Sequence, residues 1–181
     1  HVNVAGESRH ARHLPDIVAL LKSSSLPAET LARAIRCFEL LGAAESKVHG
    51  VPVDRVHFHE VGAVDAIVDI VSGCFLFELS GARAAHCSSL PGGSGEARSE
   101  HGKIPVPAPA TLELLKGAPW RFGEGEGELV TPTGAALLRA FDVSFGRPPE
   151  ITARAYGVGL GHREIPGRPN CLRVVLPGAQ L

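Results

Sequence analysis

Residues 57–69 read His57-Phe58-His59-Glu60-Val61-Gly62-Ala63-Val64-Asp65-Ala66-Ile67-Val68-Asp69, and they hold five possible metal or proton ligands in thirteen positions. His57 and His59 are two residues apart, so an extended segment projects both imidazoles to one side. Asp65 and Asp69 are four apart, so a helix would carry both carboxylates on one face. The stretch therefore predicts a turn from extended chain into helix, with a divalent-metal or acid/base site at the junction.

The segment 62–79 is mainly apolar and is too long for a typical strand, so we expect a buried helix despite its many Val and Ile residues. On this helix Asp65, Asp69 and Ser72 would form a narrow polar stripe. Buried charge is costly unless it is paired or bound to a metal, so the stripe needs partners. The alternative to a metal is ion pairing with basic residues of a neighbouring helix, namely Arg33, Arg36 or Lys47.

Apolar periodicity and helix-breaking residues predict the other elements. The clearest is a helix over 27–48, with Pro27 suited to its first turn and Gly50 just past its end. We also expect helices over 10–21, 111–116 and 131–141, an extended segment over 53–58, and strands over 84–88, 151–160 and 171–176. This alternation predicts an α/β or mixed α+β fold, with helices packed on a small mixed sheet in a single domain spanning 1–181.

Composition excludes several classes of function. Eighteen basic and nineteen acidic side chains give a net charge of −1, and no Lys/Arg run could follow a nucleic acid backbone. No apolar stretch reaches the ~20 residues that span a membrane. Four scattered cysteines without a C-x-x-C pair predict reduced, mostly buried thiols in a cytoplasmic protein. The start has neither an initiator Met nor a signal-peptide pattern, so we expect a natural N-terminus further upstream.

Three loop regions are candidates for anion binding or mobility. Gly93, Ser94 and Gly95 could present backbone N–H groups to an anion. Thr131 and Thr133 begin a helix, either as ordinary caps or beside free N–H groups that bind a phosphate or carboxylate. The Gly/Glu segment 123–128 has nothing to pack into a core and predicts a mobile acidic loop. His10 and His13 lie beside Arg9 and Arg12, and we expect that basic cluster to be solvated helix surface.

Several motifs occur in the same order along the chain and together resemble the nickel insertion protein family, the cyclometallases that complete the nickel-pincer nucleotide cofactor of lactate racemase. The motifs are Lys47-Val48-His49-Gly50, Val56-His57-Phe58-His59-Glu60-Val61-Gly62-Ala63-Val64-Asp65 with Asp69-Ile70-Val71, His101-Gly102-Lys103-Ile104-Pro105-Val106-Pro107-Ala108-Pro109-Ala110-Thr111, Glu128-Leu129-Val130-Thr131-Pro132-Thr133-Gly134-Ala135-Ala136, and Tyr156-Gly157-Val158-Gly159.

The resemblance implies a lyase-class enzyme that inserts Ni²⁺ into pyridinium-3,5-bisthiocarboxylic acid mononucleotide, using CTP hydrolysis with Mn²⁺ or Mg²⁺. On that expectation His57 and His59 bind or pass on nickel, while Asp65 and Asp69 complete or orient the site. The proton acceptor would be Glu60 or His101. The substrate's phosphate or carboxylates would be held by the residues Gly93, Ser94, Gly95, Thr131 and Thr133.

The resemblance also implies partners and missing parts. Family members carry an Asp- and Gly-rich strand motif before the first residue of this chain and a C-terminal CTP-binding domain after its last. The expected partners are the nucleotide substrate, that C-terminal domain, the lactate racemase apoprotein and a second copy of the chain, with neither nucleic acid nor membrane. Two other hypotheses stay open: a non-catalytic nickel metallochaperone or storage module, and a structural fragment whose acidic and histidine side chains form a buried network.

Overall fold

The computed structural model describes residues 12–58, 64–99, 102–161, 163–165 and 167–178. Its helices are α1 (Leu14–Lys22), α2 (Ala28–His49), the short 3₁₀ helix η1 (Val53–Arg55), α3 (Val64–Leu79), α4 (Pro109–Leu114) and α5 (Pro132–Ala140). Its strands are β1 (His86–Cys87), β2 (Leu90–Gly93), β3 (Glu96–Ser99), β4 (Gly102–Pro105), β5 (Trp120–Phe122), β6 (Ser144–Phe145), β7 (Ala153–Leu160) and β8 (Cys171–Pro177). The mixed α/β class is confirmed.

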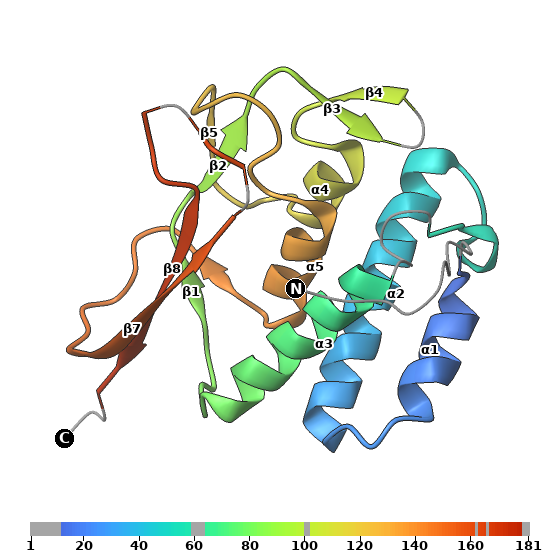
Figure 1. Cartoon of the computed structure of the whole chain (residues 1–181), viewed down its shortest axis with the longest axis horizontal. Coiled ribbons are helices and arrows are strands. Elements are labelled where there is room, and N and C mark those ends of the chain that lie inside the picture. The colour runs from blue at the N-terminus through green and yellow to red at the C-terminus, as the bar shows by residue number, and fades with distance from the viewer. Residues whose placement is uncertain (1–11, 59–63, 100–101, 162, 166, 179–181) are drawn as a thin grey trace.

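Helix α2 is the centre of the fold, and it packs against α1, α3, α4 and α5 (Figure 1). Its limits confirm the prediction for 27–48. Pro27 precedes the first turn, and Gly50 ends the helix in the left-handed conformation at φ 66°, with its N–H donating to the Ser46 carbonyl. The side chains of Cys37, Phe38 and Leu41 on α2 are fully buried in the core. Helix α2 therefore contributes the centre of the hydrophobic core against which α1, α3, α4 and α5 pack.

Helix α3 confirms the predicted helix but corrects its environment. Only Ile67, Ile70 and Cys74 are buried on it. The predicted polar stripe of Asp65, Asp69 and Ser72 is exposed instead of buried. The prediction treated the whole helix as buried, whereas α3 packs one face against α2 and α5 and leaves the polar stripe in solvent. Large apolar side chains of α3 are exposed as well, including Leu79 at 69%.

The strands form four two-stranded pairs among the described residues, which corrects the expectation of one small mixed sheet. Strands β1 and β6 are parallel, as are β2 and β5, while β3–β4 and β7–β8 are antiparallel. Most of these strands are only two to four residues long, too short to carry a second neighbour or a clear alternation of apolar residues. The expected extended segment 53–58 is also corrected, because residues 53–55 form η1.

The hairpin β7–β8 lies at one side of the molecule, away from α1 and α2 (Figure 1). The strands predicted over 151–160 and 171–176 are confirmed, and the register pairs Tyr156 with Val175 and Leu160 with Cys171. Every residue of β7 is exposed, with Tyr156 at 76% and Leu160 at 77%. A two-stranded hairpin is marginally stable by itself, so this element has an apolar surface that a partner could cover.

Within the described ranges, no helix is both long enough and apolar enough to cross a bilayer. All four cysteines are free, which agrees with the predicted reduced thiols. Cys37 and Cys74 are buried between α2 and α3, Cys87 is half-buried and Cys171 is exposed. Hydrogen bonding with Cys74 and burial raise the pKa of the Cys37 thiol. The Cys37 thiol also donates to the Ala136 carbonyl at 3.8 Å.

Candidate functional site

Two histidines from different parts of the chain meet beside the start of α1. The Phe58 N–H donates to the Arg12 carbonyl at 3.1 Å, which holds the segment before α1 against the segment after η1. Phe58 is buried in the core, which fixes the position of this backbone pairing. The ring centroids of His13 and His57 are 4.2 Å apart, with the ring planes tilted by 52°. Arg12 and His13 are thus half-buried, so the expectation of solvated helix surface is wrong for these two residues. The other two members of that basic cluster, Arg9 and His10, lie outside the described residues.

Asp65 and Asp69 lie exposed on α3, and the Asp65 carboxylate accepts a hydrogen bond from the Ala66 N–H at 2.9 Å. The predicted alternative, in which they pair with basic residues of α2, is wrong. The three bases pair with Glu29, Asp142 and Glu113 instead: Arg33 at 3.1 Å, Arg36 at 2.6 Å and Lys47 at 2.7 Å. In the part of the chain that the structure describes, no three His, Cys, Asp or Glu side chains cluster as metal ligands.

Three of the predicted residues, His59, Glu60 and His101, lie outside the described residues. The four-ligand nickel site includes His59, and both candidate proton acceptors are in this group. The ligand set and the proton acceptor therefore stay predictions.

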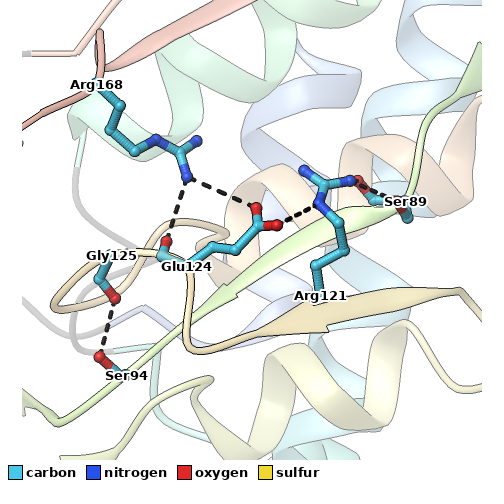
Figure 2. Close-up of polar contacts among 6 residues, drawn as sticks. All are labelled: Ser89, Ser94, Arg121, Glu124, Gly125 and Arg168. Atoms are coloured by element: carbon cyan, nitrogen blue, oxygen red, sulfur yellow. Dashed lines mark hydrogen bonds and ion pairs between the residues drawn. The ribbon is translucent and has the colours of Figure 1, made fainter.

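The loop that follows β2 contacts the Gly/Glu segment 123–128 directly. The Ser94 hydroxyl donates to the Gly125 carbonyl at 2.9 Å (Figure 2). The Ser94 carbonyl accepts from the Gly127 N–H at 2.7 Å. Gly93 has a φ of +67°, and a Cβ at that position would stand 2.2 Å from the Gly127 carbonyl oxygen. This close approach is the structural reason for a glycine here. Anion binding by Gly93, Ser94 and Gly95 stays a prediction.

Arginines surround the Gly/Glu segment. Arg121 donates to the Glu124 carboxylate at 2.9 Å, and Arg168 reaches the Glu124 carbonyl at 3.2 Å and its carboxylate at 3.9 Å (Figure 2). Arg121 also donates to the Ser89 carbonyl at 2.6 Å. A third arginine, Arg163, donates to the Glu128 carbonyl at 2.8 Å. These contacts give the segment its own polar partners, and its mobility stays a prediction.

Thr131 caps α5 as the sequence predicts. Its hydroxyl oxygen accepts a hydrogen bond from the Gly134 N–H at 3.2 Å, and Pro132 occupies the first helical turn. Thr133 lies half-buried within that turn. The cap satisfies one of the N–H groups that a phosphate could otherwise bind. A substrate contact by Thr131 or Thr133 stays a prediction.

An open cavity of about 840 Å³ lies at the C-terminal end of α2. Lys47 and Val48 line one part of it, and the turn over 105–107 with α4 lines another. These residues come from two of the quoted motifs, 47–50 and 101–111, which are far apart in sequence. The fold thus brings the two motifs to one concave, mostly apolar surface.

Two aromatic side chains of β5 complete the cavity. Trp120 and Phe122 stack with ring centroids 5.9 Å apart and planes 18° from parallel, and Phe122 is 63% exposed. Neither residue was predicted from the sequence as part of a site. The signal was present, because they are two residues apart and so share one face of a strand, and Trp120 is the single tryptophan of the chain. The pair offers an aromatic surface to a flat ligand.

Charged groups stand at the same cavity. Lys47 and Lys116 both pair with the Glu113 carboxylate, at 2.7 Å and 2.6 Å. The hydrogen bonds from Lys116 and Lys47 hold the pKa of Glu113 below its ordinary value. Two cations share one anion, so the cluster has one net positive charge. Such a cavity suits a ligand that is both aromatic and anionic.

The histidine pair and the cavity lie at the same end of α2. A Cβ on Gly42 would contact Val53 and Phe58, which places η1 and the residue after His57 against the later turns of this helix. Lys47 and Val48, in its last turn, line the cavity. A single rigid element therefore positions both candidate sites.

Comparison with known proteins shows the family to which the chain is similar. The nickel insertion protein family matches residues 1–180. A relative named for nickel insertion in Geobacter sp. (strain M21) is 47% identical over 91% of this chain and 43% of its own length. A relative named for nickel insertion in Myxococcus xanthus (strain DK1622) is 46% identical over 97% of this chain and 46% of its own length.

A further relative is the pyridinium-3,5-bisthiocarboxylic acid mononucleotide nickel insertion protein of Staphylococcus epidermidis (strain ATCC 35984), 44% identical over 93% of this chain and 42% of its own. The chain thus spans less than half the length of these relatives. No solved structure gives a significant match. The family match covers nearly the whole chain, so the chain belongs to the nickel insertion protein family.

Proposed function

We propose that this chain carries the nickel- and substrate-handling part of nickel insertion into pyridinium-3,5-bisthiocarboxylic acid mononucleotide. Its family membership and the name of the Staphylococcus epidermidis relative support this substrate. Ni²⁺ is a substrate of the reaction. The product would contain one carbon–nickel and two sulfur–nickel bonds.

The observation that carries the proposal is the cavity between the motifs 47–50 and 101–111. The substrate's ring is a flat cation, and a cation over an aromatic face is attracted by the ring quadrupole. Trp120 and Phe122 supply such faces. The thiocarboxylates and the phosphate are anions, and the net positive charge of the Lys47–Glu113–Lys116 cluster attracts them. The cavity thus offers complementary groups to both parts of the substrate.

The roles of the predicted residues follow from the bonds that must form. The ring carbon that bonds nickel loses a proton, which Glu60 or His101 accepts in this proposal. His57 and His59 deliver the ion as neutral imidazoles, a ligand type that suits Ni²⁺, and Asp65 and Asp69 complete or orient the ion's environment. Gly93, Ser94 and Gly95, with Thr131 and Thr133, would hold the phosphate or carboxylates.

Trp120 allows a direct binding test, because it is the single tryptophan and lies at the cavity. Titrating the thiolated nucleotide should quench its fluorescence. We expect Phe122→Leu to weaken that binding about two- to tenfold, since an aromatic pair contributes about 0.5–1.5 kcal/mol beyond its area. Phe75→Leu, a change at an exposed phenylalanine of α3, is the matched control. Equal affinity of both variants and the wild type would remove the cavity from the proposal.

Further features of the reaction are also proposed. These are CTP hydrolysis with Mn²⁺ or Mg²⁺ by a C-terminal domain, a lyase-class reaction in the cytoplasm, transfer of the product to lactate racemase, and association of two copies of the chain. The length of the relatives supports a further domain, since this chain covers less than half of each. Supplying the thiolated nucleotide, Ni²⁺, CTP and Mn²⁺, together with that domain, and detecting the nickelated product by mass separates the enzyme from a metallochaperone. Bound nickel without product would favour the metallochaperone.

A further inference from the structure

We propose that His13 is a further imidazole ligand of the nickel-handling site and acts together with His57. This inference rests on the proposed function, because it adds a ligand to the same site. His13 lies immediately before α1 and is separated from His57 by more than forty residues, so sequence spacing alone does not connect them. Their connection comes from the antiparallel contact between Arg12 and Phe58.

The distance between the two rings suits a shared ion. A metal–nitrogen distance of about 2.1 Å places two adjacent imidazole centroids on one octahedral ion roughly 4.6 Å apart. The observed centroid separation is 4.2 Å, so a small rotation of either side chain admits the ion. The 52° tilt between the planes also differs from parallel stacking, so the rings are not arranged as a simple stacked pair. The separation of the ring centroids is therefore compatible with two imidazoles bound to one cation.

The hydrogen bond of His13 selects the nitrogen that would bind the metal. Its Nδ1 lies 3.1 Å from the Val56 carbonyl oxygen. A carbonyl only accepts, so Nδ1 carries the proton and the neutral ring has its lone pair on Nε2. Metal-binding histidines usually donate their other ring N–H to a carbonyl or carboxylate, which fixes the tautomer and the ring orientation. The hydrogen bond from His13 Nδ1 to the Val56 carbonyl is a contact of this kind.

The backbone around His13 holds the imidazole in place. The His13 N–H donates to the Asp16 carboxylate at 3.1 Å, and its carbonyl accepts from the Asp16 N–H at 3.0 Å and the Ile17 N–H at 3.2 Å. Ile17 is fully buried. Starting a helix does not itself require histidine, because Ser, Thr, Asp and Asn are the preferred residues there. His13 is the residue that begins α1 in a capping box with Asp16. The contacts of its ring with Val56 and His57 come in addition to that role.

The imidazole pair of His13 and His57 suits a metal ion that is transferred to a substrate. Neutral imidazole binds Ni²⁺ well and is a neutral ligand that the substrate's sulfur atoms can replace. His57 is exposed, so the pair is accessible from solvent. The pair of imidazoles therefore suits a nickel ion that is bound and then passed on to the nucleotide.

The test measures Ni²⁺ binding to the 181-residue chain by calorimetry, with His57→Ala, His13→Asn and His86→Asn. Asparagine can start a helix, so His13→Asn keeps the helix start. His86 is the matched control, because its Nε2 also lies beside a backbone carbonyl, that of Arg147, at 3.0 Å. We expect His13→Asn to weaken Ni²⁺ binding at least about tenfold, the lower end of the effect of losing an outer-shell partner. His86→Asn should bind as the wild type does.

A spectroscopic readout separates a ligand from a merely structural residue. With Cu²⁺ as probe, the electron paramagnetic resonance spectrum should show one coordinated nitrogen fewer in His13→Asn than in wild type. With Zn²⁺ as a diamagnetic probe on the unaltered chain, the ¹⁵N resonance of His13 Nε2 should shift, while Nδ1 keeps its proton. This second measurement needs no variant and stands even where a substitution impairs folding.

The outcomes distinguish the two levels of the proposal. If His57→Ala loses Ni²⁺ while His13→Asn retains it with the same nitrogen count, and Zn²⁺ leaves the His13 resonance unmoved, the role of His13 is overturned and the proposed function stands. If His57→Ala binds Ni²⁺ as tightly as wild type, or the wild-type chain binds none, the nickel site itself is overturned and His13 falls with it.

Discussion

Arg36 of α2 and Asp142, which follows α5, form a two-pronged ion pair: the two guanidinium nitrogens donate to the two carboxylate oxygens at 2.7 and 2.6 Å. Asp142 has a φ of 50°, a left-handed conformation that Asp and Asn tolerate better than most residues. The pair fastens the end of α5 to the central helix. Both side chains are largely exposed, at 47% and 71%.

Asp142→Asn keeps the backbone conformation and removes the charge. Exposed ion pairs are screened, so we expect a loss of less than about 1 kcal/mol of unfolding free energy at pH 7, measured with urea. The hydrogen bonds from Arg36 lower the pKa of Asp142. A lowered folded-state pKa adds stability above the unfolded-state value and loses it as pH falls through the folded value. The difference between variant and wild type should therefore shrink below about pH 4.

Asp54→Asn, at an exposed aspartate of η1, is the control for removing one negative charge. The ion pair would be irrelevant to stability if both variants showed the same loss at pH 7 and the same dependence on pH.

Gly93→Ala should destabilise the chain more than Gly95→Ala. Both residues have positive φ, at 67° and 81°, so each alanine carries a backbone cost of about 1–2 kcal/mol. Only at Gly93 would the new Cβ collide with backbone, 2.2 Å from the Gly127 oxygen, whereas Gly95 faces open space. The collision adds about 1–3 kcal/mol. Urea unfolding of both variants checks this, and equal losses would contradict the close approach.

Thr30 and Glu78 join α2 to α3 through a hydrogen bond from the buried threonine hydroxyl to the carboxylate. Thr30→Val keeps the volume and removes the donor, so we expect a loss of about 1–3 kcal/mol because the half-buried Glu78 loses its partner. Thr30→Ser keeps the donor and is the comparison. In a double-mutant cycle, Glu78→Gln should cost less when it is added to the Thr30→Val variant than when it is made alone. Strict additivity would show that the bond contributes nothing.

Thiol labelling should separate the cysteines by their burial. A disulfide reagent at pH 8 should react rapidly with the exposed Cys171, more slowly with the half-buried Cys87, and hardly with Cys37 or Cys74. The raised pKa of Cys37 lowers its thiolate fraction further. Cys171→Ser should remove the fast phase. All four thiols should react in denaturant, and rapid labelling of Cys37 in the native chain would contradict the α2–α3 packing.

Long elements with local signals could be predicted from the sequence. Helix α2 has apolar periodicity together with Pro27 and Gly50 at its ends, and β7 and β8 are long enough to be recognised. The pairing of the short strands could not be predicted. Leu90 pairs with Trp120, thirty residues later in the sequence, and neither segment has a pattern that specifies its partner. The degree of burial of α3 could not be predicted either, because its exposed apolar side chains, such as Leu76 and Leu79, are of the same types as core residues.

For the candidate site, the sequence identified His57 but not its neighbour. The approach of His13 depends on the contact between Arg12 and Phe58, which is tertiary and leaves no periodic pattern. The cavity is similar, since Lys47 and Trp120 come together only when α2, α4 and β5 have packed. Motif recognition found the segments, while their spatial relation needed the structure.

The central position of α2 bears on how a nascent chain gains its core. Its contacts with α1 and α3 join neighbours in sequence, but the Cys37 thiol and the Arg36 side chain reach residues 99 and 106 positions later. Synthesis runs from the N-terminus, so one face of α2 stays uncovered until α5 has left the ribosome. We expect a chain shortened before Pro132 to bury this helix incompletely and to need protection from aggregation while it waits.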